Sequence, residues 1–312
     1  MSGLDALLTP LARLVLALAL APLLLGVVNR TEALVAGRRG KPLLQVYFDV
    51  AKLLRKGAVF STTTTWAFGL GPTLGLAATA AALLLVPQGG LPGPVSFSGD
   101  FILLAYLLAA GRLATLLSAL DTGSSFEGMG ASREAAFAAL AEPALFLALA
   151  ALAAHRGGLS LHAMLAGSAP GDLAALEPAP ALAALSLFVV LLAENCRIPV
   201  DDPTTHLELT MVHEVMVLDH GGPDLGLIEY AAALKLWLYC ALVAGVLLPS
   251  LPGGLWPDTL AVLAVILGLG VAVGLVESAM ARLRLNRVPQ LLTWAAALSA
   301  LALILKVWEA GS

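Results

Sequence analysis

Long apolar runs recur along this chain and constrain its fold more than any other feature. Eight of them, rich in Leu, Ala and Val, cover 8–28, 66–86, 101–120, 134–154, 179–194, 230–249, 258–280 and 289–308. A helix needs about 20 mostly apolar residues to cross the hydrocarbon core of a membrane. The runs lack the two-residue alternation of barrel strands, and a backbone in lipid must satisfy its own hydrogen bonds. The sequence therefore predicts an all-α, polytopic membrane bundle of about eight transmembrane helices, forming a single domain over 1–312.

Basic residues are distributed unevenly between the loops. Loop 29–65 carries seven Lys and Arg residues and loop 281–288 carries three, whereas loops 87–100 and 250–257 carry none. Loops rich in Lys and Arg stay on the cytoplasmic side. Because the sides alternate through eight spans, we expect both termini to lie on the outer, non-cytoplasmic side of the cell inner membrane. We also expect contact with the lipid bilayer and none with nucleic acid.

The first cytoplasmic segment, 29–65, is too long to be a simple turn. Over 42–54 its apolar positions recur every three or four residues. This spacing predicts an amphipathic helix that lies along the membrane surface. The pattern is equally typical of a plain surface anchor.

The second cytoplasmic segment, 194–229, is acidic and holds eight of the 21 Asp and Glu residues. Asp202-Pro203 is typical of a helix start, and Gly221-Gly222-Pro223 is typical of a stop. We therefore expect a helix over about 203–218. Its many apolar positions predict that it is buried against the bundle rather than simply solvated.

Ionisable residues within the apolar runs are the most informative candidates for function. A charge in the hydrocarbon region costs several kcal/mol, so such residues face the bundle interior and serve either transport or pairing. Glu142, which precedes Pro143, and Arg112 lie well inside their spans, and they could form a static ion pair instead of a transport site. Glu194 ends the fifth span, Lys235 lies in the first turns of the sixth, and Glu277 lies beside basic residues that indicate an interfacial position.

Histidine and cysteine spacing argues against a metal centre in this chain. His206, His213 and His220 are spaced by seven, which would align them on one helical stripe but about 10.5 Å apart at each step. Single histidines beside carboxylates could instead relay protons or cap a helix. Cys196 and Cys240 form no C-x-x-C motif, so we expect neither zinc nor an iron–sulfur cluster here.

One motif resembles the signature of subunit 1 of respiratory complex I: Ala193-Glu194-Asn195-Cys196-Arg197-Ile198-Pro199-Val200-Asp201-Asp202-Pro203. The first loop resembles that family through Arg39, Gly40, Pro42, Leu44, Gln45, Asp49, Lys52 and Leu53, as does Gly130-Ala131-Ser132-Arg133 followed by Glu142. The stretch 207–225, which includes His213-Glu214, is similar to the homologous membrane subunit of group 4 [NiFe] hydrogenases. These resemblances cover essentially the whole chain.

The resemblance implies a non-catalytic membrane subunit of a redox-driven, proton-translocating complex. It implies an internal proton path through Glu142, Glu194, Glu208, Glu214, Arg112, Arg197, His213 and Lys235, with Glu134 as a further candidate. It also implies that 29–65 and 194–229 form a docking platform for a peripheral arm, through Arg38, Arg39, Gln45, Asp49, Lys52, Asp201 and Asp202. The expected partners are hydrogenase-like large and small subunits, iron–sulfur subunits and antiporter-like membrane subunits, with the [NiFe] and iron–sulfur centres in those partners and no cofactor in this chain.

Three alternatives remain open. The chain could be subunit 1 of an NADH:quinone oxidoreductase and line the quinone site, but Pro203-Thr204-Thr205-His206-Leu207-Glu208 stands where complex I subunits carry two more acids. It could be a secondary transporter, although the paired Gly/Pro interruptions of duplicated halves are not visible. It could also be a passive anchor, which would need the loops but neither Glu142 nor Arg112.

Overall fold

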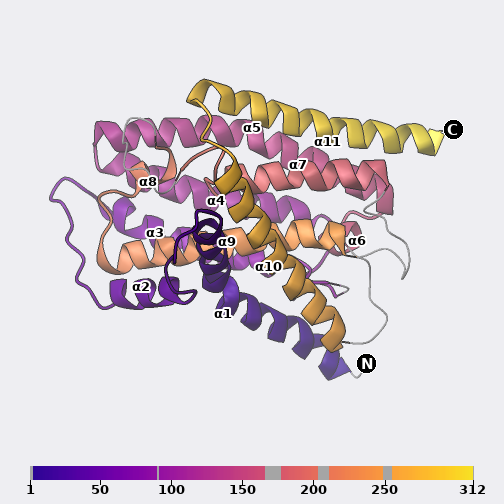
Figure 1. The fold of residues 1–312 in the computed structure, drawn as a ribbon, viewed down its shortest axis with the longest axis horizontal. Coiled ribbons are helices and arrows are strands. Elements are labelled where there is room, and N and C mark those ends of the chain that lie inside the picture. The colour runs from indigo at the N-terminus through magenta and orange to yellow at the C-terminus, as the bar shows by residue number, and fades with distance from the viewer. Residues whose placement is uncertain (1–2, 90, 166–176, 203–210, 249–254, 312) are drawn as a thin grey trace.

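The computed structural model describes the whole chain except residues 1–2, 90, 166–176, 203–210, 249–254 and 312 (Figure 1). Every regular element in this described part is a helix, and seven helices there are long and apolar enough to cross a membrane. An eighth, α7, is apolar but shorter. The all-α polytopic class is therefore confirmed. The seven long helices and the shorter α7 are, in chain order, α1 (Gly3–Val35), α3 (Trp66–Leu83), α4 (Asp100–Asp121), α5 (Ser125–Arg156), α7 (Pro178–Glu194), α9 (Gly222–Leu247), α10 (Leu255–Ala279) and α11 (Val288–Gly311).

Each of the eight predicted runs matches one of these helices, although the runs 66–86, 230–249 and 258–280 extend one to three residues beyond the helix end, and α9 begins eight residues earlier than expected. Gly221-Gly222-Pro223, predicted to stop a helix, instead starts one. Proline fits the first helical turn because its missing N–H would have no partner there. Lys235 consequently lies near the middle of α9 rather than in its first turns.

The short helices correct part of the second prediction. Helix α2 (Gln45–Leu53) confirms the helix expected in the first loop. The helix expected over 203–218 lies partly outside the described residues, and 211–218 contains only the single turn α8 (His213–Met216). The Asp201 carboxylate accepts hydrogen bonds from the backbone N–H groups of Val212 (2.9 Å) and His213 (3.4 Å), which fixes where this turn begins.

The histidine stripe is therefore wrong for the described histidines. His213 opens α8, whereas His220 lies in the loop before α9. His206 lies outside the described residues. The two remaining imidazoles sit in different surroundings, because the chain changes direction between them.

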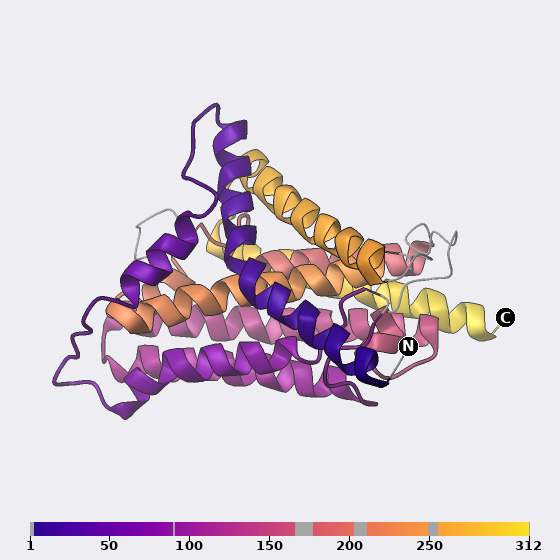
Figure 2. The same cartoon turned by 90° about the horizontal axis from the view of Figure 1, so that it is seen from below.

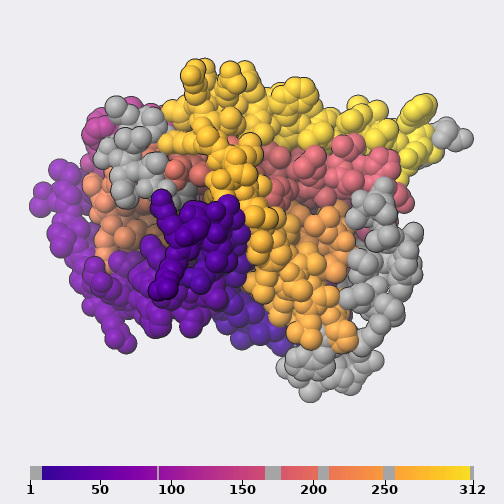
Figure 3. Space-filling model, viewed as in Figure 1, coloured from indigo at the N-terminus to yellow at the C-terminus, as the bar shows by residue number. Residues whose placement is uncertain are grey.

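Helix α9 forms the centre of the bundle (Figures 1 and 2). Its residues from Ala233 to Val246 are all buried except one, and Trp237 and Tyr239 are among the largest fully buried side chains. Around it, α5 packs with α7 and α11, α3 packs with α4, and α1 packs with α10. In the space-filling view, α1 and the loop after it cover the middle of one face beside α10 (Figure 3).

Small residues allow the helices to approach closely, as is usual where lipid removes the hydrophobic drive between helices. A Cβ added to Gly71 of α3 would lie 2.5 Å from the Ser118 Cβ of α4, so only glycine fits there. Between α5, α7 and α11, Ser299 donates to the Ala144 carbonyl and Ser186 donates to the Ala295 carbonyl. These contacts fix the bundle that holds the site.

The two long loops meet at one end of the bundle, and both chain termini lie at the opposite end (Figures 1 and 2). A Cβ on Gly222 would lie 2.6 Å from the Gly57 carbonyl oxygen. The ring of His220 stacks on Phe68, in the first turn of α3 just after the first segment, with centroids 4.0 Å apart. Segments 29–65 and 194–229 are thus in direct contact.

Candidate functional site

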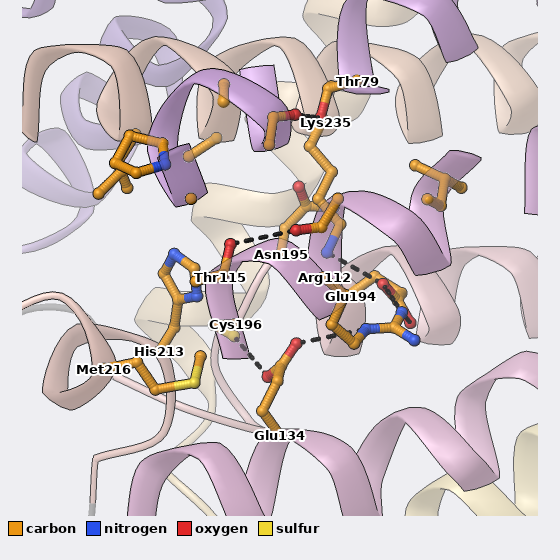
Figure 4. Close-up of a pocket in the computed structure, with 18 of the residues that line it drawn as sticks. Thr79, Arg112, Thr115, Glu134, Glu194, Asn195, Cys196, His213, Met216 and Lys235 are labelled. Carbon is orange, nitrogen blue, oxygen red and sulfur yellow. Dashed lines mark hydrogen bonds and ion pairs between the residues drawn. The ribbon is translucent and has the colours of Figure 1, made fainter. Parts of the chain in front are cut away.

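Charged side chains, several of them buried, gather where α4, α5, α7 and α9 approach one another. Arg112 of α4 donates through Nη2 to both carboxylate oxygens of Glu194, at 2.6 and 2.7 Å. Its Nη1 donates to Glu142, and its Nε lies 3.6 Å from Glu134 Oε1. The Lys235 ammonium of α9 lies 3.0 Å from Glu194 Oε2 (Figure 4). We call these five residues the Arg112 cluster.

The cluster carries more acids than bases. Three carboxylates (Glu134, Glu142, Glu194) face two cations (Arg112, Lys235), which leaves one excess negative charge when all are ionised. The Glu194 and Arg112 side chains are only 4% and 8% exposed. Taking such charges out of water costs several kcal/mol per ion and is offset only by close pairing. A proton on one carboxylate would remove the excess charge.

The end of α7 places Glu194 inside the protein. Glu194 is the last residue of this helix, and the Asn195 side chain donates to the Leu191 carbonyl at 2.8 Å to close the final turn. Cys196 then adopts a left-handed conformation with φ of 49°, which is uncommon for a residue other than glycine. This turn brings the Cys196 thiol within 3.9 Å of Glu134 Oε2, and burial raises the pKa of that thiol.

A cavity of about 110 Å³ adjoins the Arg112 cluster (Figure 4). We call it the central cavity. It has room for several water molecules, and its polar walls supply the partners that ordered water requires. Side chains from α3, α4, α5, α7 and α9 line it together with the loop after α7, and they include Thr79, Thr115, Glu134, Glu194, Cys196, Arg197, His213 and Lys235.

His213 meets this cavity as a neutral imidazole. Burial, together with the positive charge of Lys235, lowers its pKa to about 4, although Asp201 partly opposes the shift. At neutral pH the ring therefore offers one donor and one acceptor. Asp201 holds the backbone of His213, so it positions the ring indirectly.

The structure brings together four of the predicted path residues: Arg112, Glu142, Glu194 and Lys235. Arg197 and His213 line the central cavity, and Glu214 lies on α8 without lining it. Glu208 lies outside the described residues. The Arg112–Glu142 pair suggested by the sequence is present, but it is part of a larger group that includes Glu134.

Cys196 and Tyr239, which the sequence did not assign to the proton path, also lie beside the Arg112 cluster. Cys196 lines the central cavity, and the fully buried phenol of Tyr239 interacts with Glu194. A polar phenol in the middle of the apolar run that forms α9 was the available signal for Tyr239. The position of Cys196 depends on the turn after α7, which local spacing does not reveal.

The predicted docking residues divide into two groups. Arg38, Arg39 and Lys52 are exposed, and Gln45 donates to Asp49 at 2.8 Å on the surface of α2. Asp201 is 1% exposed and forms an ion pair with Arg282 at 2.9 Å. Its assignment to a docking surface is therefore wrong, because its carboxylate is used to hold the loop before α8. Asp202 is partly buried beside it.

Glu277 lies in the last turn of α10, and the interfacial position predicted from the adjacent arginines stays a prediction. Glu277 is 7% exposed and lies 3.6 Å from Arg197 Nη1. The arginine that approaches it comes from the loop after α7 rather than from the neighbouring sequence. Long-range packing has therefore buried this carboxyl group.

Comparison with known families identifies the chain's relatives. The NADH dehydrogenase family matches residues 9–308. The chain belongs to this family. It is 32% identical to formate hydrogenlyase subunit 4 of Escherichia coli (strain K12) over 303 residues, which cover 92% of this chain and 94% of that one. It is also 32% identical to hydrogenase-4 component C of the same organism over 239 residues, 77% of this chain and 74% of the relative.

A solved structure shares the fold. A chain of the membrane-bound sulfane sulfur reductase, an archaeal respiratory membrane complex, aligns with a TM-score of 0.80 over 97% of this chain and 99% of its own length, at 23% identity. The family match and the 32% identical relatives make the chain a membrane subunit of the complex I and hydrogenase type. The resemblance seen in the sequence is confirmed.

Proposed function

We propose that this subunit joins a peripheral redox arm to proton-pumping membrane partners and carries the first part of their proton path. The observation that supports this most is the Arg112 cluster, whose three carboxylates share two cations beside a cavity large enough for water. Buried carboxylates that compete for too few cations exchange protons as a coupled group. Such a group suits proton transfer better than a balanced ion pair does.

Glu142 is the proposed exit from the cluster. Its side chain is 42% exposed although it lies in the middle of a membrane-length helix, just before Pro143. An ionisable group facing lipid at that depth costs about 3 kcal/mol or more. We therefore expect this face of α5 to be covered in the complex by a membrane partner, of the antiporter-like class, that receives the proton.

The two contacting loops form the proposed docking platform. Segment 29–65 exposes basic side chains, including Arg38 and Arg39, together with apolar ones such as Leu44 and Phe48. An apolar centre with a charged rim is the usual composition of a protein interface. We expect the occupants to be hydrogenase-like large and small subunits and iron–sulfur subunits, which would hold the [NiFe] and iron–sulfur centres.

The hydrogenase branch is favoured over the quinone branch by the two relatives, whose names place them in formate hydrogenlyase and hydrogenase-4. Purification of the intact membrane complex tests this choice. We expect it to contain nickel and to evolve or oxidise H₂ without added quinone. Quinone-dependent turnover without nickel would instead place this chain with the NADH:quinone oxidoreductases.

The proposed orientation has both termini outside the inner membrane. The buried positions of Cys196 and Cys240 make introduced cysteines readable against a low background. Cysteines at Ser2 and Ser312 should react with an impermeant reagent added outside intact cells, and one at Ser61 should not. Labelling of either terminus only after the membrane is opened would contradict this orientation.

A further inference from the structure

A second cavity, of about 260 Å³, lies between α1, α10 and the loop after α7. Its wall includes Glu32 of α1, Glu277 and Ser278 of α10, and Asp202 of the loop. The C-terminal parts of α1 and α10 run side by side here (Figure 2), and a Cβ on Gly274 would lie 2.8 Å from the Thr31 Cβ. The Arg112 cluster does not contribute to this cavity.

Glu277 faces this cavity without adequate partners. Its side chain is 3% exposed, and neither carboxylate oxygen has a hydrogen-bond partner among the described residues. The nearest cation, Arg197 Nη1, lies 3.6 Å from Oε1, which is too far for a hydrogen bond. The Glu32 carboxyl group faces the same Glu277 carboxyl group from α1.

The charges around this pair do not balance. Arg197 offers one positive charge to two carboxyl groups, Glu32 and Glu277. Arg282 forms an ion pair with Asp201 at 2.9 Å, and Asp202, which has an interaction of its own, also lines the cavity wall. Two carboxylates that face each other beside a single arginine repel, and this repulsion favours a proton on one of the two. One bound proton brings Glu32, Glu277 and Arg197 to zero net charge.

We propose that Glu32 and Glu277 form a second proton-binding site, in which one proton is shared between two carboxyl groups that face the cavity between α1 and α10. Arg197 lines the central cavity and also approaches Glu277, so it stands between this site and the Arg112 cluster. The use of the site rests on the proposed function, in which its proton exchanges with the central cavity past Arg197. The binding of the proton is a property of the pair alone.

Infrared difference spectroscopy of the intact purified complex tests the shared proton directly. A protonated carboxyl group has a C=O stretch that is separate from carboxylate bands. At pH 7 we expect wild type to show one more protonated carboxyl group per complex than Glu277→Gln and one more than Glu32→Gln. In Glu277→Gln, the partly exposed Glu32 no longer faces a second carboxyl group, so the reason for a shared proton is removed. In Glu32→Gln, Glu277 ionises beside Arg197.

A matched control is Glu309→Gln, which removes an exposed carboxyl group paired with Lys306 at 2.7 Å and should leave this band unchanged. Retention of the band in both variants would overturn the proposal, because both acids would then be ionised in wild type. Loss in only one variant would overturn the sharing. If Glu277→Gln fails to assemble, retention of the band in Glu32→Gln still overturns the sharing, because Glu277 would then hold the proton without Glu32. The readout does not depend on turnover, so it can fail while the proposed function stands, or the reverse.

Discussion

Two arginines are buried in this membrane bundle, and their surroundings differ. Arg13 of α1 forms an ion pair with Asp258 at 2.8 Å, donates to Thr259 Oγ1 at 3.1 Å and donates to the Gln88 carbonyl. Its side chain is 5% exposed and that of Arg112 is 8% exposed, so burial does not distinguish them. Arg112 instead meets three carboxylates, and a second cation shares one of them.

The difference separates a structural ion pair from a group suited to proton exchange. Among the described side chains, Asp258 is the acid that forms an ion pair with Arg13, and a proton bound to Asp258 would break this pair. Around the Arg112 cluster, a proton restores the balance, and the central cavity gives it a route. A buried charge is therefore informative about function through the number of its partners rather than through its burial.

The largest expected effect is that of Arg112→Gln. The substitution leaves Glu134, Glu142 and Glu194 with Lys235 as their one remaining cation within the cluster. Breaking a buried ion pair by removing one partner costs about 3–5 kcal/mol, and here three acids lose theirs. We expect little assembled complex, measured as the amount of the subunit recovered with its partners after mild solubilisation. Normal recovery would mean that these acids hold protons already in wild type.

Arg13→Gln should have a smaller effect. Asp258 loses its cation, but it is 13% exposed and lies in the first turn of α10, where the helix dipole favours a negative charge. We expect an assembled complex with a lower thermal midpoint and unchanged proton translocation per electron. A coupling defect in this variant would end the distinction between the two arginines.

Much of this fold follows from the sequence because membrane helices are encoded locally. A run such as 101–120 predicts α4 from its length and apolar character alone. Helices α5 and α9 begin earlier than predicted, because the polar and glycine residues near Ser125 and Gly222 are helical although they are not part of the apolar runs. The single turn α8 differs from the longer helix predicted over 203–218. It begins where the Asp201 carboxylate, 12 residues before His213, accepts a backbone hydrogen bond.

The site was less predictable than the fold. Charged residues within apolar runs identified Arg112, Glu142 and Lys235 individually. Their meeting depends on which helices pack together, and small residues permit many pairings. The approach of Arg197 to Glu277 joins two segments 80 residues apart and leaves no local signal.

A pH prediction concerns His220, which lies in the loop before α9. Burial lowers the pKa of His220 to about 4, against an ordinary value of 6.5, although Asp219 partly opposes the shift. Between these values the unfolded chain binds more protons, so stability falls as pH falls from about 6.5 to 4. We expect His220→Gln to reduce this loss by on the order of 1–2 kcal/mol, measured as thermal midpoint against pH.

The interpretation of His220 depends on that slope. The His220 ring also forms a hydrogen bond through Nε2 with the Ser118 hydroxyl at 2.9 Å, so the variant is expected to be less stable at pH 7. A uniform loss at every pH, with the slope unchanged, would show that another group causes the acid sensitivity.

The smallest expected effect lies at the exposed surface. Arg39→Glu reverses a solvent-exposed charge on the proposed platform, where salt screens electrostatic attraction. We expect the peripheral arm to dissociate at lower salt than in wild type, with the membrane bundle still folded. Arg287→Glu is the matched control, because it makes the same charge change on an exposed residue outside the two segments. Equal salt sensitivity in both variants would argue against the platform.

The most direct test of the central claim is the number of protons translocated per electron by the intact complex in liposomes. Glu194→Gln and Glu142→Gln change the charge of the Arg112 cluster, and Asp258→Asn makes the corresponding change beside Arg13. We predict that both glutamate variants assemble and transfer electrons but translocate fewer protons per electron than wild type. The aspartate variant should translocate normally. Poor assembly of the glutamate variants, with normal coupling in the complexes that survive, would instead make the Arg112 cluster a static ion-pair group.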